Sequence, residues 1–157
     1  MKLKGLIDED FVNYKDPSLF LIFPFCTFKC EKECGIQCCQ NSSLAKQPII
    51  EISTEKLVRR YLENPISESV VMGGMEPLDS FEDVIEFVSV LRKYSEDPVI
   101  LYTGYYKSEI EDKIEQLQNF PNIIVKFGRF KPNEPHHIDP ILGVELASTN
   151  QYAEKIS

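Results

Sequence analysis

The sequence has no tryptophan, only two histidines, and no cysteine outside one short segment. Basic residues are also scarce, because 17 Lys and Arg stand against 25 Asp and Glu and give a formal net charge of −8. A chain this acidic is poorly suited to the phosphate backbone of nucleic acids, so we predict no nucleic-acid partner. No apolar run approaches the roughly 20 residues of a membrane-spanning helix, so we predict no membrane segment.

The N-terminus lacks the apolar run of a signal peptide, because acidic residues begin at Asp8. We therefore expect a cytoplasmic protein. In a reducing compartment, clustered cysteines more often bind metal or carry out redox chemistry than form disulfides. The histidines, His136 and His137, follow Pro135 far from the cysteines in the chain. We interpret them as surface loop residues, and the sequence assigns them no further role.

The length of 157 residues suits one domain and is too short for a complete eight-stranded β/α barrel of about 250 residues. Strand-like and helix-like segments alternate along the chain, which predicts an α/β fold with a mainly parallel sheet. The segments predicted as buried strands are 19–23, 69–72, 99–102 and 123–127. The predicted helices are 54–64 and two that begin at serine caps, Ser80 and Ser108.

The remaining segments have weaker patterns. Residues 1–17 suggest a short hairpin or edge strand, 131–144 a proline-rich loop, and 144–148 one last strand. The distinctive residues follow the predicted strands, since the cysteine segment, Gly73-Gly74, Thr103-Gly104 and Gly128 each come directly after one. Ligands bind at the carboxyl edge of parallel α/β sheets, so we predict a binding site there.

The five cysteines all fall in one segment of 14 residues, as Cys26, Cys30, Cys34, Cys38 and Cys39. Thiolates this dense suit a zinc ion or an iron–sulfur cluster. Structural zinc sites usually show paired Cys-x-x-Cys knuckles or histidine partners, and the segment has neither. This favours an iron–sulfur cluster.

A buried strand followed by Cys26-x-x-x-Cys30 resembles the cluster loop of the radical S-adenosylmethionine (SAM) enzymes. The resemblance implies a [4Fe-4S] cluster held by three cysteines, with the fourth iron open to bind SAM. The family's CxxxCxxC pattern would place its third cysteine at position 33, where this chain has Glu33. Cys39 is favoured instead, because Cys39-Gln40-Asn41 resembles the family's ending, and Cys38 and Cys34 remain alternatives.

Further segments, in the same order, resemble the activating protein of anaerobic ribonucleotide reductase. They are Asp10-Phe11-Val12-Asn13-Tyr14, Gly73-Gly74-Met75-Glu76-Pro77-Leu78, Tyr102-Thr103-Gly104-Tyr105, Gly128-Arg129-Phe130 and Ser148-Thr149-Asn150-Gln151. The last two depart from the family, which has aspartate where this chain has Phe127 and glycine where it has Ala147.

The resemblance implies one radical SAM-like domain over 1–157, with cluster loop 26–41, folded as a partial (open) β/α barrel. It implies that Gly73, Gly74 and Glu76 shape the SAM pocket, with Thr103 a further candidate and Phe28 near the cluster or adenine. A second interpretation of Glu76 is a solvated acidic residue in a turn, and the sequence favours neither interpretation. For Arg129, a surface ion pair is favoured over a ligand contact.

The implied activity is reductive cleavage of SAM to a 5′-deoxyadenosyl radical, which generates a glycyl radical on the large subunit of anaerobic ribonucleoside-triphosphate reductase. The implied electron donor is a flavodoxin or ferredoxin. Two alternatives remain: an iron–sulfur electron-transfer or cluster-carrier protein without SAM chemistry, and a radical SAM enzyme with another partner. A zinc-stabilised binding module is a further reading of the same cysteines.

Overall fold

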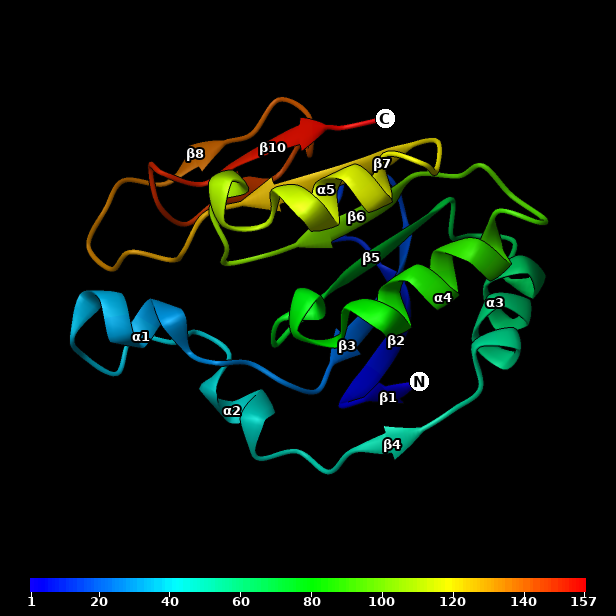
Figure 1. Ribbon diagram of the computed structural model, residues 1–157, viewed down its shortest axis with the longest axis horizontal. Coiled ribbons are helices and arrows are strands. Elements are labelled where there is room, and N and C mark those ends of the chain that lie inside the picture. Colours follow the sequence, from blue (N-terminus) through cyan, green and yellow to red (C-terminus); the bar gives the residue numbers. More distant parts are fainter.

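The computed structural model describes residues 1–157, and its main sheet has six strands in the order β10-β7-β6-β5-β3-β2 (Figure 1). The four central strands are mutually parallel: β3 (Ser18–Phe23), β5 (Ser69–Gly74), β6 (Val99–Tyr102) and β7 (Ile123–Phe127). The edge strands β2 (Gly5–Asp10) and β10 (Tyr152–Lys155) run antiparallel to their neighbours. The sheet is therefore mainly parallel and does not close into a barrel.

Each parallel pair of strands is joined by a crossover that contains a helix. Figure 1 shows α3, α4 and α5 together on one face of the sheet. From β3 to β5 the chain forms α1 (Lys29–Cys34), α2 (Ser42–Ala45), the short strand β4 (Ile50–Glu51) and α3 (Thr54–Glu63). The next crossovers contain a 3₁₀ turn at Pro77–Ser80 with α4 (Phe81–Leu91), and a 3₁₀ turn at Lys107–Glu109 with α5 (Glu111–Leu117).

Two small two-stranded ladders complete the fold. The strand β1 (Lys2–Leu3) pairs with β4, and β8 (His137–Ile138) pairs with β9 (Glu145–Leu146). The longest helix, α4, has 11 residues, and none of the helices has the length and apolar character needed to cross a membrane.

The two faces of the sheet are filled differently. Alternate residues of the central strands pack under α3, α4 and α5 in a core of 23 buried residues, to which β3 contributes Leu19, Leu21 and Phe23. The opposite face holds a cluster of only seven buried residues, centred on Val71 and Ile100. Burial on both faces explains why the central strands read as continuous apolar runs. The smaller second cluster leaves space on its face for a binding site.

The four central strands were predicted within two residues of their observed ends, whereas several weaker predictions were wrong. The last strand of the sheet is β10, not 144–148, where β9 is a two-residue strand outside the main sheet. Ser108 does not cap α5, because it lies inside a 3₁₀ turn and Ile110 precedes the helix. Ser80 does precede α4, but its hydroxyl makes no capping hydrogen bond and is buried without a partner.

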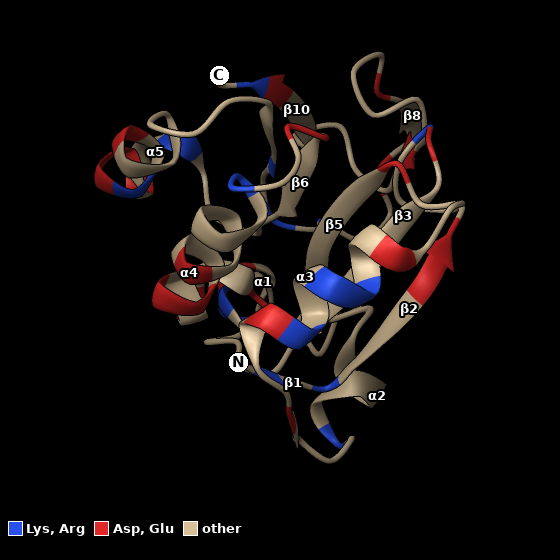
Figure 2. Cartoon of the chain, turned by 90° about the vertical axis from the view of Figure 1, so that its right-hand side faces the viewer, with Lys and Arg blue, Asp and Glu red and all other residues tan.

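Charged residues are unevenly distributed over the surface, with acidic side chains along β2 and α4 and basic ones grouped on α3 (Figure 2). The two meet where Arg60 of α3 donates to both carboxylate oxygens of Asp8, at 2.5 and 2.6 Å. This exposed pair joins the edge strand β2 to α3.

We expect Gly74→Ala to destabilise the protein by about 2–4 kcal/mol, since strained φ and overpacking each cost roughly 1–3 kcal/mol. Gly74 has φ +86, and a Cβ there would lie 2.4 Å from Ile22 Cγ2 and 3.1 Å from Ile22 Cα. Gly35→Ala is the matched control, because Gly35 has φ +71 but nothing within 4 Å of the added Cβ. Urea unfolding measures both. Equal losses in the two variants would contradict the crowding at Gly74.

Candidate metal centre

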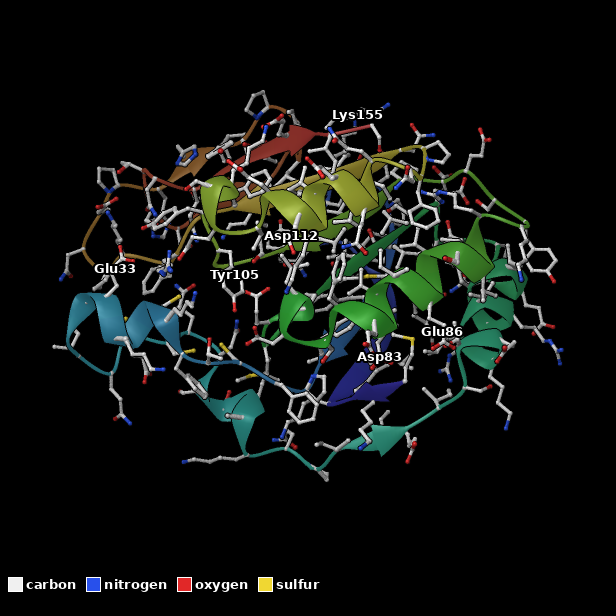
Figure 3. The ribbon with its side chains drawn as sticks, viewed as in Figure 1. Glu33, Asp83, Glu86, Tyr105, Asp112 and Lys155 are labelled. Carbon is white, nitrogen blue, oxygen red and sulfur yellow. The ribbon has the colours of Figure 1, made fainter.

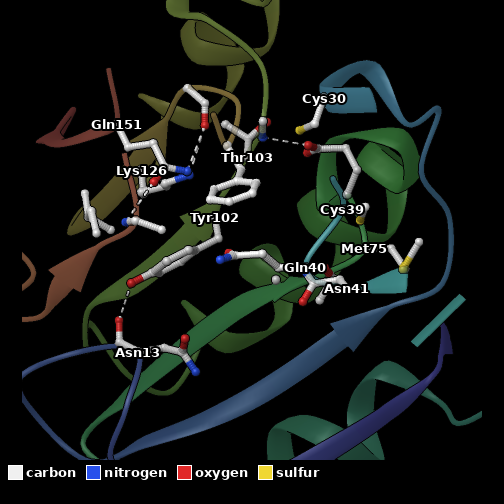
Figure 4. A pocket seen from close by; sticks show the side chains of 18 of the residues that line it. Asn13, Cys30, Cys39, Gln40, Asn41, Met75, Tyr102, Thr103, Lys126 and Gln151 are labelled. Carbon is white, nitrogen blue, oxygen red and sulfur yellow. Dashed lines mark hydrogen bonds between the residues drawn. The ribbon is translucent and has the colours of Figure 1, made fainter. Parts of the chain in front are cut away.

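A cavity of about 370 Å³ opens at the carboxyl ends of the central strands, on the sheet face opposite α3, α4 and α5 (Figure 4). Three of the five cysteines line it: Cys26, Cys30 and Cys39. The predicted pocket residues Gly73, Gly74, Glu76 and Thr103 line it too. Cys34 and Cys38 are not among its lining residues, nor is Phe28, which borders a separate surface hollow.

Local backbone geometry brings the three cysteines together. Cys26 follows β3, and Phe28 adopts a left-handed conformation (φ 53) that starts α1, so Cys30 lies in the first turn of that helix. Gly35 ends α1 with φ 71 and reverses the chain. The backbone N–H of Cys39 then donates to Glu31 Oε1 of α1 at 3.4 Å. Between Cys30 and Cys39 the chain therefore completes α1 and then turns back, so that Cys39 lies against that helix.

The sulfur atom of Cys26 has a backbone donor. The N–H of Phe28 donates to Cys26 Sγ at 3.2 Å. Burial nevertheless raises the pKa of Cys26 to about 11 and raises the pKa of Cys30 above its usual value. Hydrogen bonds from backbone N–H groups to cysteine sulfur are among the features that set the reduction potential of an iron–sulfur cluster.

The donor set fits a cluster better than a single ion. No three His, Cys, Asp or Glu side chains are arranged to hold one metal ion together. In a [4Fe-4S] cluster each cysteine binds a different iron, so its ligands surround a larger group than the four-coordinate zinc of a structural site. Three thiols around one cavity match that requirement.

The glycine-rich end of β5 is tied to the cysteine loop. Asn41, two residues after Cys39, donates from Nδ2 to the Gly74 carbonyl at 2.7 Å. The N–H of Glu76 donates to the Phe25 carbonyl, next to Cys26, at 2.8 Å. These contacts hold the two predicted halves of the site, the cluster loop and the glycine-rich turn, against each other.

Glu76 is buried, so its interpretation as a solvated turn residue was wrong. Its Oε2 accepts from the N–H of Gly104 at 2.9 Å, and its Oε1 accepts from the N–H of Leu78 at 3.1 Å. Burial raises the pKa of Glu76 to about 7 despite these donors. The carboxyl group therefore connects the turn after β5 to the turn after β6, beside the buried Thr103.

Lys126 of β7 is a cavity residue that the sequence interpretation missed. It is 6% exposed, and its ammonium group donates to the Gly128 carbonyl at 3.0 Å (Figure 4). Burial lowers the pKa of Lys126 to about 8. The signal was present as one lysine in the apolar run Ile123-Ile124-Val125-Lys126-Phe127. A buried ammonium group is costly without an anionic or polar partner. Lys126 lines the cavity, so a ligand bound there is able to supply that partner.

Arg129 forms the predicted ion pair, but it is buried rather than on the surface. It is 6% exposed and donates to both oxygens of Glu109 at 2.7 and 2.9 Å. Its Nε also lies 3.1 Å from Glu33 Oε2, and Tyr106 donates to the other Glu33 oxygen at 2.8 Å. Glu33 projects from α1, which has no buried residue (Figure 3). Polar contacts therefore fix α1 to the body of the protein.

We expect Arg129→Gln to destabilise the protein most above about pH 4.5. Arg129 lowers the pKa of Glu109 to about 2, whereas Glu109 in the unfolded chain keeps its usual value near 4.5. The unfolded state therefore takes up this proton first as pH falls, and the stabilisation is lost between these two values. Urea midpoints of the metal-free proteins from about pH 3 to 6 measure the effect. A difference between wild type and variant that stays constant across this range would contradict the account.

The histidines lie outside the cavity. His136 is exposed and its Nδ1 lies 2.8 Å from Glu145 Oε1, while His137 is half-buried in β8. His136 is on the surface as predicted, whereas His137 is half-buried in the short strand β8 rather than in a surface loop.

The fold and the cavity define an α/β protein with a cysteine-lined cavity at the carboxyl ends of its parallel strands. A family model described as a 4Fe-4S single cluster domain matches residues 18–149, well over half of the chain. The chain belongs to this family of iron–sulfur domains, which is associated with radical SAM proteins. No match was found among curated proteins. The family supports a [4Fe-4S] cluster as the cofactor.

Proposed function

We propose that the protein is a [4Fe-4S]- and SAM-dependent activase that generates a glycyl radical on anaerobic ribonucleoside-triphosphate reductase. The observation that carries the proposal is that one cavity is lined both by three cysteines and by the glycine-rich turn after β5. A cluster carrier needs the cysteines but has no use for the second half of the cavity. An enzyme that holds a cluster and a substrate side by side needs both.

The proposed fold is the open, partial β/α barrel of radical SAM enzymes. The spatial order β3-β5-β6-β7 follows the sequence order, and the crossover helices share one face of the sheet (Figure 1). This is the arrangement of successive right-handed βα units in barrels. The cavity lies at the carboxyl ends of the strands, where barrel enzymes bind their substrates.

Cys26, Cys30 and Cys39 are the proposed cluster ligands. Their shared cavity supports Cys39 over Cys34 and Cys38 as the third ligand. Three protein ligands leave one iron without a cysteine, and an open coordination position distinguishes a catalytic centre from a closed structural one. Phe28 contributes its backbone N–H to Cys26 rather than a side chain in the cavity.

The other side of the cavity suits the amino-acid part of SAM. Gly73 lies near the end of β5, and a Cβ on it would lie 3.0 Å from the Phe20 ring of β3, so glycine allows close packing at this wall of the cavity. The Lys126 ammonium group has three donor protons and one protein acceptor, so it is able to bind a carboxylate. Phe20, Tyr102 and Phe130 also line the cavity and would exclude water around the reacting atoms.

When bound, the reduced cluster supplies one electron that cleaves a carbon–sulfur bond of SAM, yielding methionine and the radical that takes a hydrogen atom from the partner's glycine. The chain's own residues position SAM, shield it from water and hold the cluster. The proposed electron donor is a flavodoxin or ferredoxin.

Electron spin resonance tests the proposal directly. Anaerobic incubation of the reconstituted protein with dithionite, SAM and the reductase from the same organism is expected to produce a glycyl radical on the reductase. Omitting SAM, or using Cys39→Ala, should abolish the signal. SAM cleavage without a radical on this reductase would keep the enzyme class and change the partner.

A further inference from the structure

Asn41 connects the segment that carries Cys39 to the glycine-rich end of β5. It lies two residues after Cys39, and its Nδ2 donates to the carbonyl oxygen of Gly74 at 2.7 Å. Asn41, Cys39 and Gly74 all line the cavity, and Figure 4 shows Asn41 and Cys39 on the same side of it. One side-chain amide therefore joins a proposed cluster ligand to the opposite half of the site.

The segment that carries Cys39 has few other attachments. None of residues 35–47 is buried. The carboxylate of Glu31 accepts from the Cys39 N–H at 3.4 Å, and the ammonium group of Lys4 donates to the Ala45 carbonyl at 2.9 Å. Segments with little buried surface and few contacts have low local stability. A bond from Cys39 to iron would therefore restrain this segment more than its own contacts do.

The glycine-rich turn after β5 is attached to the cysteine segment at two points. Gly74 pairs with Phe23 at the end of β3, and the N–H of Glu76 donates to the Phe25 carbonyl at 2.8 Å. Phe25 directly precedes Cys26. The second attachment is the Asn41 amide, which reaches Gly74 from the far end of the cysteine segment. Any change in the order of that far end is therefore transmitted to the turn through Asn41.

We propose that Asn41 is a positioning residue that couples the cluster to the glycine-rich turn. When Cys39 is bound to iron, the Asn41 amide is held in place and in turn holds the Gly74 carbonyl, so the turn becomes more ordered. A ligand that binds the ordered turn loses less conformational entropy, and by linkage the same ligand stabilises the bound cluster. The effect on SAM rests on the proposed function, whereas the effect on the turn needs only the cluster.

Hydrogen exchange of the turn tests this coupling without SAM. Amide exchange of residues 73–78 is followed by mass spectrometry in cluster-loaded and cluster-free protein, for wild type, Asn41→Ala and Asn41→Leu. Leucine matches the shape of asparagine but has no donor. Cluster loading should slow exchange about 3–10-fold in wild type and less than about 2-fold in both variants, because each variant lacks one hydrogen bond.

Three results would overturn the proposal. The first is no slowing of exchange in wild type, and the second is equal slowing in wild type and either variant. The third is loss of the iron from both variants, which would show that Asn41 supports only the ligand segment.

SAM affinity tests the consequence for the proposed function. Cluster-loaded Asn41→Ala should bind SAM about 3–10-fold more weakly than wild type at equal iron content, measured by equilibrium dialysis. Gln37→Ala is the matched control, because Gln37 is exposed in the same segment but lies outside the cavity, and it should bind SAM like wild type. Equal affinities in Asn41→Ala and wild type would overturn the coupling to SAM. A wild type that binds no SAM would instead contradict the proposed function, and the exchange result would still decide the role of Asn41.

Discussion

Replacing Cys39 with alanine is expected to abolish cluster binding, whereas Cys34→Ala is expected to leave it intact. Cys39 lines the cavity with Cys26 and Cys30, and Cys34 does not. Removing one of three ligands leaves a cluster with two attachments, and cluster stability depends on its thiolate ligands. After anaerobic reconstitution, wild type and Cys34→Ala should be brown, with about four irons per chain, and Cys39→Ala should retain less than about one.

Cys38→Ala is the closest control, because it removes the thiol next to Cys39 without touching the cavity. It should bind iron like wild type. Iron retained in Cys39→Ala but lost in Cys38→Ala or Cys34→Ala would move the third ligand to that residue. A colourless wild-type protein that binds zinc would contradict the cluster itself.

Lys126→Met is expected to weaken SAM binding about 10–100-fold, since a hydrogen bond to a charged group contributes roughly 1.5–3 kcal/mol. The ammonium group is buried in the cavity wall with one protein acceptor. Burial already lowers the pKa of Lys126 to about 8, so removing the charge should not destabilise the fold. Equilibrium dialysis of SAM against the reconstituted proteins gives the affinity, and urea unfolding gives the stability.

Lys155→Met is the matched control, because Lys155 is exposed on β10 and contacts Asn122 at 2.9 Å rather than the cavity. It should bind SAM with wild-type affinity. Unchanged SAM affinity in Lys126→Met would show that Lys126 does not bind SAM. A large loss of stability would show instead that the lysine stabilises β7.

The central sheet was predictable because its strands are buried on both faces and therefore appear as unbroken apolar runs, as in Leu19-Phe20-Leu21-Ile22-Phe23. The edge strand β10 was not, because Tyr152–Lys155 is half charged and pairs with only one neighbour. The sequence of α1 also gave no helical signal, since a helix without a buried face has no apolar period to detect.

The candidate site was predictable where its residues are neighbours in the sequence and form a recognisable motif. Cys39-Gln40-Asn41 and Gly73-Gly74 are local motifs, and the Asn41–Gly74 contact now joins them. Lys126 had a local signal, as the one lysine in an apolar strand, but the burial of Arg129 depends on segments far apart in the chain, which no local pattern encodes. Glu76 is such a case too, because only the fold brings the Gly104 N–H to its carboxylate.

Reductive cleavage of SAM is the most direct test of the central claim that this cavity holds a cluster and SAM together. The reconstituted protein is incubated anaerobically with dithionite and SAM, and methionine and 5′-deoxyadenosine are quantified. We predict equal amounts of the two products from wild type and none from Cys39→Ala. A wild-type protein that carries a full, reducible [4Fe-4S] cluster and leaves SAM intact would contradict the account and favour an electron-transfer or cluster-carrier protein.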